Sequence, residues 1–158
     1  MCLYYSVIVR KNMYQKILIP TDGSDLCWKA AQEGIRFAKA NNAQVVAFHA
    51  IPTTSYMLFP ESGPSDSIID RFEKEADQRA NLFVTKIIEH AQAAAIKAEA
   101  VCQKTDYVWK GIIETATAHH CDLIFMASHG RRGLANLLLG SETMKVLTHS
   151  SIAVLVYR

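Results

Sequence analysis

The sequence lacks the cysteine and histidine patterns that mark metal sites or disulfide frameworks. Its four cysteines are scattered, with no C-x-x-C pair and no Cys/His ligand spacing, at positions 2, 27, 102 and 121. Such thiols are typical of a reducing compartment, so we predict a cytoplasmic protein without a metal site. No segment approaches the ~18 apolar residues of a membrane span. The net charge is +2, without a basic run, so neither a membrane nor a nucleic acid is an expected partner.

Two familiar nucleotide-binding motifs are also missing. The sequence has no Gly-x4-Gly-Lys-Ser/Thr, so it supplies no lysine of that kind to the β- and γ-phosphates of a nucleotide. It has no Gly-x-Gly-x-x-Gly either, which disfavours a flavin or dinucleotide enzyme. The pattern also offers no evident general base and no acidic cluster for Mg²⁺. We therefore assign no catalytic residues, and expect at most weak hydrolysis or autophosphorylation with any nucleotide that the protein binds.

What the chain does have is enough apolar residues for one globular domain. It is 158 residues long and 50% hydrophobic, which suffices for a buried core. Met13 stands just before the first convincing strand pattern. We therefore predict that residues 13–158 form a single domain and that residues 1–12 are an N-terminal extension, which either is not native or adds an edge strand.

Short apolar runs alternate with segments of helical periodicity along this domain. The runs predict strands, and the apolar residues at spacings of three and four predict helices. The strands are expected over 16–20, 43–51, 98–103, 123–127 and 152–156, and the helices over 25–41, 67–95, 107–119 and 141–149. This alternation is typical of an α/β fold, a doubly wound parallel sheet with helices on both faces.

Residues 52–65 interrupt the alternation. Three prolines (Pro52, Pro60 and Pro64) surround an apolar centre in this segment. A loop of this kind can serve as a lid or a partner contact, or its apolar side chains can pack back on the domain. The sequence leaves both interpretations open.

The most informative segment follows the strand over 123–127. Met126-Ala127-Ser128-His129-Gly130 is followed nine residues later by Gly140-Ser141, where the last helix begins. Glycines let backbone amides approach an anion closely, and the first turn of a helix offers free amides to phosphate oxygens. The intervening Arg131 and Arg132 contact phosphate or are solvated. A surface loop whose glycines only make turns fits the local pattern equally well.

The predicted topology brings this segment close to a second one. Ligands of doubly wound sheets bind outside the carboxyl ends of the strands, where the strand order reverses. Thr21 and Asp22 follow the first strand, and residues 127–141 follow the fourth. If these two strands are neighbours, Asp22 and the glycine loop face one crevice.

These residues resemble the universal stress protein family over about Met13 to Arg158. The resemblance is carried by the opening Ile17-Leu18-Ile19-Pro20-Thr21-Asp22-Gly23-Ser24, the two glycine segments and the closing Ile152-Ala153-Val154-Leu155-Val156. The nucleotide-binding branch carries Gly-x-x-Gly-x9-Gly-Ser/Thr, and here the first position is Ala127. Binding weakens if that position requires a positive φ, because alanine has a Cβ. The resemblance implies an adenine-nucleotide alpha hydrolase-like sheet of order 3-2-1-4-5 and a homodimer through Ile152–Val156.

The resemblance also implies which residues hold a nucleotide. Asp22 is expected to accept hydrogen bonds from the ribose or adenine, although a helix cap is an alternative role. The other expected contacts are Pro20, Thr21 and Ala50 for the base, Met126, Ala127, His129 and Gly130 for the ribose and α-phosphate, and Gly140, Ser141 and Thr143 for the outer phosphates. For His129, the backbone alone is an alternative to the ring.

The function that follows is a cytoplasmic stress-response protein that binds ATP or another adenine nucleotide as a dimeric sensor. Mg²⁺ or Mn²⁺ would be bound through the phosphates. Two alternatives remain open at this point. One is a dimeric interaction protein of the same fold that binds no nucleotide, which the alanine at position 127 favours. The other is an enzyme that slowly cleaves ATP or adenylates a substrate.

Overall fold

Strands and helices alternate along the whole chain of the computed structural model, which describes residues 13–53, 66–130 and 139–158. The elements are β1 (Lys16–Pro20), α1 (Asp25–Asn41), β2 (Gln44–Ile51), α2 (Asp66–Ala93), β3 (Ala98–Lys104), α3 (Val108–Ala118), β4 (Leu123–Ala127), α4 (Ser141–His149) and β5 (Ala153–Tyr157). Each expected helix and strand is present, with ends that move by at most two residues. The predictions for 1–12, for most of 52–65 and for the two arginines after Gly130 lie outside the described residues.

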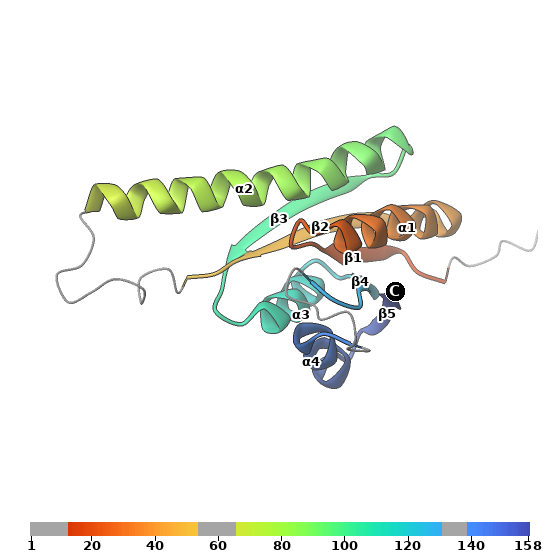
Figure 1. Cartoon of the computed structure of the whole chain (residues 1–158). Coiled ribbons are helices and arrows are strands. Elements are labelled where there is room, and N and C mark those ends of the chain that lie inside the picture. Colours follow the sequence, from red (N-terminus) through yellow and green to blue (C-terminus); the bar gives the residue numbers. More distant parts are fainter. Residues whose placement is uncertain (1–12, 54–65, 131–138) are drawn as a thin grey trace, which may run out of the picture.

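The strands form one parallel sheet in the order β3-β2-β1-β4-β5, which confirms the expected order (Figure 1). Strand β1 lies in the middle of the sheet. The chain moves from β1 to β2 and β3 on one side, and then returns to β4 and β5 on the other. The strand order therefore reverses between β1 and β4, where open α/β sheets form a crevice.

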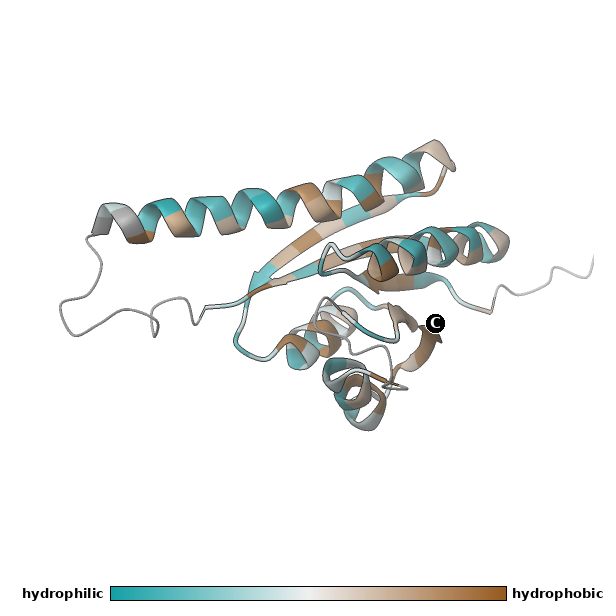
Figure 2. Ribbon diagram, in the orientation of Figure 1, coloured by the Kyte–Doolittle hydropathy of each residue, from teal (hydrophilic) through white to brown (hydrophobic). Residues whose placement is uncertain are grey.

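The alternation of side chains along the strands divides the core into two layers. Ile17 and Ile19 of β1 face α1 and α2, whereas Leu18 of the same strand faces α3 and α4. All three are fully buried. Both faces of the sheet are thus covered at its centre, which explains why β1 and β4 have nearly continuous apolar sequences. Figure 2 shows the strands mostly brown, and teal hydrophilic residues along α1 and α2.

The turn after β1 begins α1 with a conventional cap. Ser24 is the N-cap, and its hydroxyl accepts a hydrogen bond from the Cys27 amide at 3.3 Å. Asp22 accepts from the amide of Ser24 at 2.9 Å, so its carboxylate organises the turn rather than capping the helix. Within the described residues, no helix is both long enough and apolar enough to cross a bilayer.

Candidate functional site

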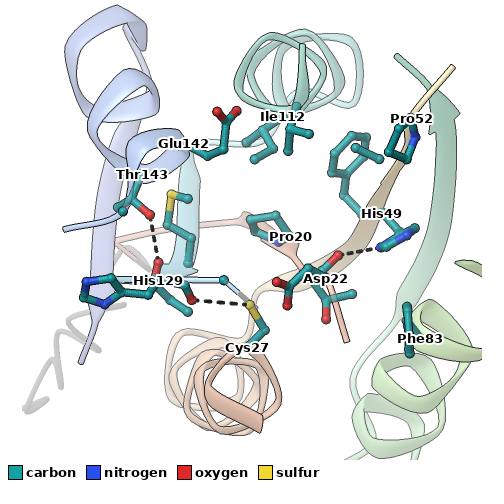
Figure 3. A pocket seen from close by; sticks show the side chains of 18 of the residues that line it. Pro20, Asp22, Cys27, His49, Pro52, Phe83, Ile112, His129, Glu142 and Thr143 are labelled. Carbon is teal, nitrogen blue, oxygen red and sulfur yellow. Dashed lines mark hydrogen bonds between the residues drawn. The ribbon is translucent and has the colours of Figure 1, made fainter. Parts of the chain in front are cut away.

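A cavity of about 600 Å³ lies at the carboxyl ends of β1, β2 and β4. This volume is within the range of small-molecule sites, roughly 300–1,000 Å³. Figure 3 looks into the cavity, with Thr143 and His129 on one side, His49 and Phe83 on the other, and Asp22 between them. The structure brings all the sequence-predicted site residues to its wall: Pro20, Thr21, Asp22, Ala50, Met126, Ala127, His129, Gly130, Gly140, Ser141 and Thr143.

The turn after β1 and the loop after β4, which we expected to face one crevice, are in contact. A Cβ placed on Gly130 would lie 2.5 Å from Oδ2 of Asp22 and 3.4 Å from its Cγ. The space beside the glycine is thus already occupied by the carboxylate. Asp22 Oδ1 accepts a hydrogen bond from the Ser24 amide, and this bond holds the carboxylate in place. With the carboxylate there, residue 130 has no room for a Cβ and must be glycine.

The beginning of α4 is tied to the end of β4 by two hydrogen bonds. The amide of Gly140 donates to the carbonyl of Ser128 at 2.8 Å, and the hydroxyl of Thr143 donates to the carbonyl of Ala127 at 3.1 Å. The first amides of an α-helix have no partner within the helix, and they favour anions. Here those amides belong to Ser141, Glu142 and Thr143, which all line the cavity.

Ala127, the departure from the family pattern, fits its position without backbone strain. It is the last residue of β4 and is only 4% exposed. The non-glycine residues of positive φ among those described are Asn42, Ala95 and His120, so alanine at 127 adopts an ordinary conformation. The backbone argument against nucleotide binding, which depended on a positive φ there, is therefore removed.

The loop after β4 places His129 between the strand and the cavity. Its Nδ1 lies 2.9 Å from the hydroxyl of Ser128, which is 1% exposed. Its Nε2 is buried and has no hydrogen-bond partner in the part of the chain that the structure describes. The carbonyl of His129 faces the thiol of Cys27 at a sulfur–oxygen distance of 3.9 Å.

Cys27 lines the cavity but is poorly suited to act as a nucleophile. Burial, and then the negative charge of Asp22, raise the pKa of its thiol to about 11. The thiolate is the reactive form of cysteine, and it is scarce at neutral pH when the pKa is this high. The structure therefore agrees with a packing role for Cys27.

The opposite wall contains residues that the sequence interpretation did not include. They come from β2 and the residue after it, the first half of α3, and the middle of α2: Phe48, His49, Ile51, Pro52, Ala76, Arg79, Phe83, Val108 and Ile112. His49 Nδ1 lies 2.7 Å from the carbonyl of Thr21, and its ring contacts that of Phe83. The sequence analysis lacked any signal that α2 crosses this end of the sheet, because only the tertiary packing sets where a crossover helix lies.

Glu142, in the first turn of α4, is the second carboxylate that lines the cavity. Its Oε2 accepts from the amide of Trp109, in the first turn of α3, at 2.9 Å. Its Oε1 lies 3.0 Å from Nζ of Lys145. The carboxylate thus joins the starts of two helices.

Among the described residues, no group of three histidine, cysteine or acidic side chains is placed to hold a metal ion.

Comparison with known proteins gives the same fold. The profile of the universal stress protein family matches residues 13–158. Universal stress protein MJ0531 of Methanocaldococcus jannaschii is 34% identical over 148 residues, which span 94% of this chain and 84% of that protein. The solved structure of MJ0577 from the same archaeon superposes with a TM-score of 0.77 at 25% identity, covering 91% of this chain and 95% of that one.

A second solved structure, of a universal stress protein in complex with cAMP, superposes with a TM-score of 0.67 at 22% identity. It covers 92% of this chain and 97% of that one, so a structural relative binds a nucleotide. The family profile spans all of the described residues. The chain therefore belongs to the universal stress protein family.

Proposed function

We propose that this protein binds ATP, or another adenine nucleotide, in the cavity at the ends of β1, β2 and β4. The observation that carries the proposal is the contact between Asp22 and Gly130 beside the free start of α4. A carboxylate suits the hydroxyl groups of a ribose, and helix amides suit phosphates. One ligand that carries both groups, with a planar base against Pro20, Thr21 and Ala50, fits this arrangement.

The residue roles follow from the two sides of the cavity. We assign the base to Pro20, Thr21 and Ala50, and the ribose to Asp22. On the side of β4 and α4, we assign the ribose and α-phosphate to Met126, Ala127, His129 and Gly130. We assign the outer phosphates to Gly140, Ser141 and Thr143. Mg²⁺ or Mn²⁺ would be held through the phosphates.

Binding rather than rapid turnover is the activity we propose. Both carboxylates of the cavity wall have structural partners, since Asp22 accepts from the Ser24 amide and Glu142 accepts from the Trp109 amide. A general base must lie within hydrogen-bond reach of the proton that it removes. Asp22 is assigned to the ribose, and both oxygens of Glu142 are engaged, Oε2 by the Trp109 amide and Oε1 by Lys145.

We also propose that the protein acts in the cytoplasm as a dimeric sensor of stress or energy state. The support for the dimer is β5, an edge strand that pairs with β4 on one side. Its residues Val154–Tyr157 are only half-buried, and exposed edges favour pairing with another strand. Sedimentation of the purified protein tests this, because a monomer at micromolar concentration would contradict it.

The test of nucleotide binding is calorimetric titration of the nucleotide-stripped protein with ATP. We expect the wild type to bind, and Asp22→Ala to lose most of that affinity. Asp22→Asn is the matched variant, because it keeps the size of the side chain and an acceptor for the Ser24 amide while removing the charge. No heat of binding from well-folded wild type would contradict the proposal and direct attention to protein partners.

A further inference from the structure

The cavity extends beyond the residues assigned to the nucleotide, toward α2. Ala76, Arg79 and Phe83 line it from this helix, at spacings of three and four residues that place them on one helix face. Ile51 and Pro52, which directly follow Ala50, line the same end. This end of the cavity is therefore mostly apolar, and it adjoins the place assigned to the base.

Arg79 differs from those charged residues of α2 that form ion pairs. Arg71 pairs with Glu75 at 3.0 Å, and Glu73 pairs with Lys104 of β3 at 2.9 Å. No hydrogen bond or ion pair is found for Arg79 among the described residues. It is also the only lysine or arginine among the described residues of the cavity wall. Arg79 is exposed to solvent, and it also borders the cavity.

The position of Arg79 relates it to the base rather than to the phosphates. Figure 3 places Thr143 and His129, which flank the phosphate end, across the cavity from Pro52 and Phe83. Arg79 belongs to the same helix as Phe83. A guanidinium group is planar and weakly hydrated, so it stacks on aromatic faces, including nucleobases, more readily than an ammonium group does.

We propose that Arg79 stacks on the nucleobase and covers the α2 end of the cavity, which makes it a determinant of base recognition. The inference rests on the proposed nucleotide site, and it adds a contact from α2 to the residues assigned there. The alternative role of an arginine near a nucleotide is an ion pair with phosphate. An ion pair requires the phosphates of the ligand, whereas stacking requires a planar side chain at position 79.

The experiment compares ATP with adenosine, which has the base and ribose but no phosphate. The affinities for both ligands are measured for the wild type, Arg79→Ala and Arg79→Lys. The affinity for adenosine is obtained from its competition with ATP. If Arg79 stacks on the base, Arg79→Ala weakens both ligands by the same factor, roughly three- to tenfold. Arg79→Lys does not restore the affinity, since lysine keeps the charge but not the plane. Arg71→Ala, on the same helix and away from the cavity wall, is the control and leaves both affinities unchanged.

Three results would overturn the inference. A loss for ATP alone, restored by lysine, would show a phosphate contact. Unchanged affinity for both ligands in Arg79→Ala would show that the side chain remains in solvent. If the wild type binds neither ATP nor adenosine, the proposed nucleotide site itself fails, and this is seen before any variant is compared. Loss of folding is checked by circular dichroism, and is not expected for an exposed side chain.

Discussion

Replacing Gly130 with alanine places a methyl group against the carboxylate of Asp22. The new Cβ would lie 2.5 Å from Oδ2, well inside van der Waals contact, so one of the two residues must move. Gly130 is not at a positive φ, so alanine adds no backbone strain and the perturbation is purely steric. The carboxylate is the softer partner, and it moves by giving up its 2.9 Å hydrogen bond from the Ser24 amide.

The size of the effect follows from the hydrogen bonds of that carboxylate. A hydrogen bond to a charged group contributes about 1.5–3 kcal/mol, and because the bond from Ser24 to Asp22 is only partly buried, we place it near the low end of that range. The folded state therefore loses roughly 1–2 kcal/mol of unfolding free energy. A rotated carboxylate no longer meets the ribose, and the loss of one such bond weakens ATP binding roughly ten- to a hundredfold. Gly130→Val, with its branched side chain, abolishes binding.

Calorimetric titration of four proteins tests this reasoning: the wild type, Gly130→Ala, Asp22→Ala and the double variant. Neighbouring residues that act through one contact have non-additive effects. Once Asp22 is alanine, the atom that Gly130→Ala displaces is gone, so the second substitution changes the affinity less than about twofold. Wild-type affinity in Gly130→Ala would refute the argument. An equal loss in both backgrounds would refute it too, because the methyl group would then act without Asp22.

Gly23→Ala is expected to lower the free energy of unfolding by about 2–4 kcal/mol, because Gly23 has φ +80° and its Cβ would lie 2.3 Å from the ring of Phe83. Urea unfolding measures this, and a change below about 1 kcal/mol would contradict it. Lys16, and then His119, hold the pKa of Glu99 below its ordinary value. The stability that Glu99 contributes is thus complete above the pKa of an unfolded glutamate, about 4.3, and is lost as the pH falls through the lower folded pKa. Glu99→Gln should therefore be less stable than the wild type at pH 7 and approach it in acid, and parallel pH profiles would contradict this.

The strands were predictable because parallel strands are buried on both faces. Runs such as Leu123–Ala127 are apolar at every position, and the structure gives that strand the predicted bounds. The helix ends were less certain, because caps depend on local geometry. The sequence left open whether Asp22 caps α1, and the structure gives that role to Ser24 while Asp22 holds the turn.

The candidate site was predictable to the extent that it follows from strand order. Residues that follow β1 and β4 must share one edge of a parallel sheet, so Asp22 and Gly130 could be paired from the pattern and the family resemblance. The backbone angle φ at Ala127 could not be predicted, because the identity of an alanine residue does not determine its φ. The structure supplies the ordinary conformation that leaves the motif intact.

The sequence by itself determined the alternation of elements, the buried faces of the strands and the glycine loop, since these depend on residue type and short-range spacing. Only the tertiary structure decided which residues of α2 border the cavity. The helix crosses from β2 to β3 over 28 residues, and its periodicity defines an apolar face without stating which part of that face meets the sheet. Phe83 packs against Gly23 and His49, and this packing brings Arg79 to the end of the cavity that we propose for the base.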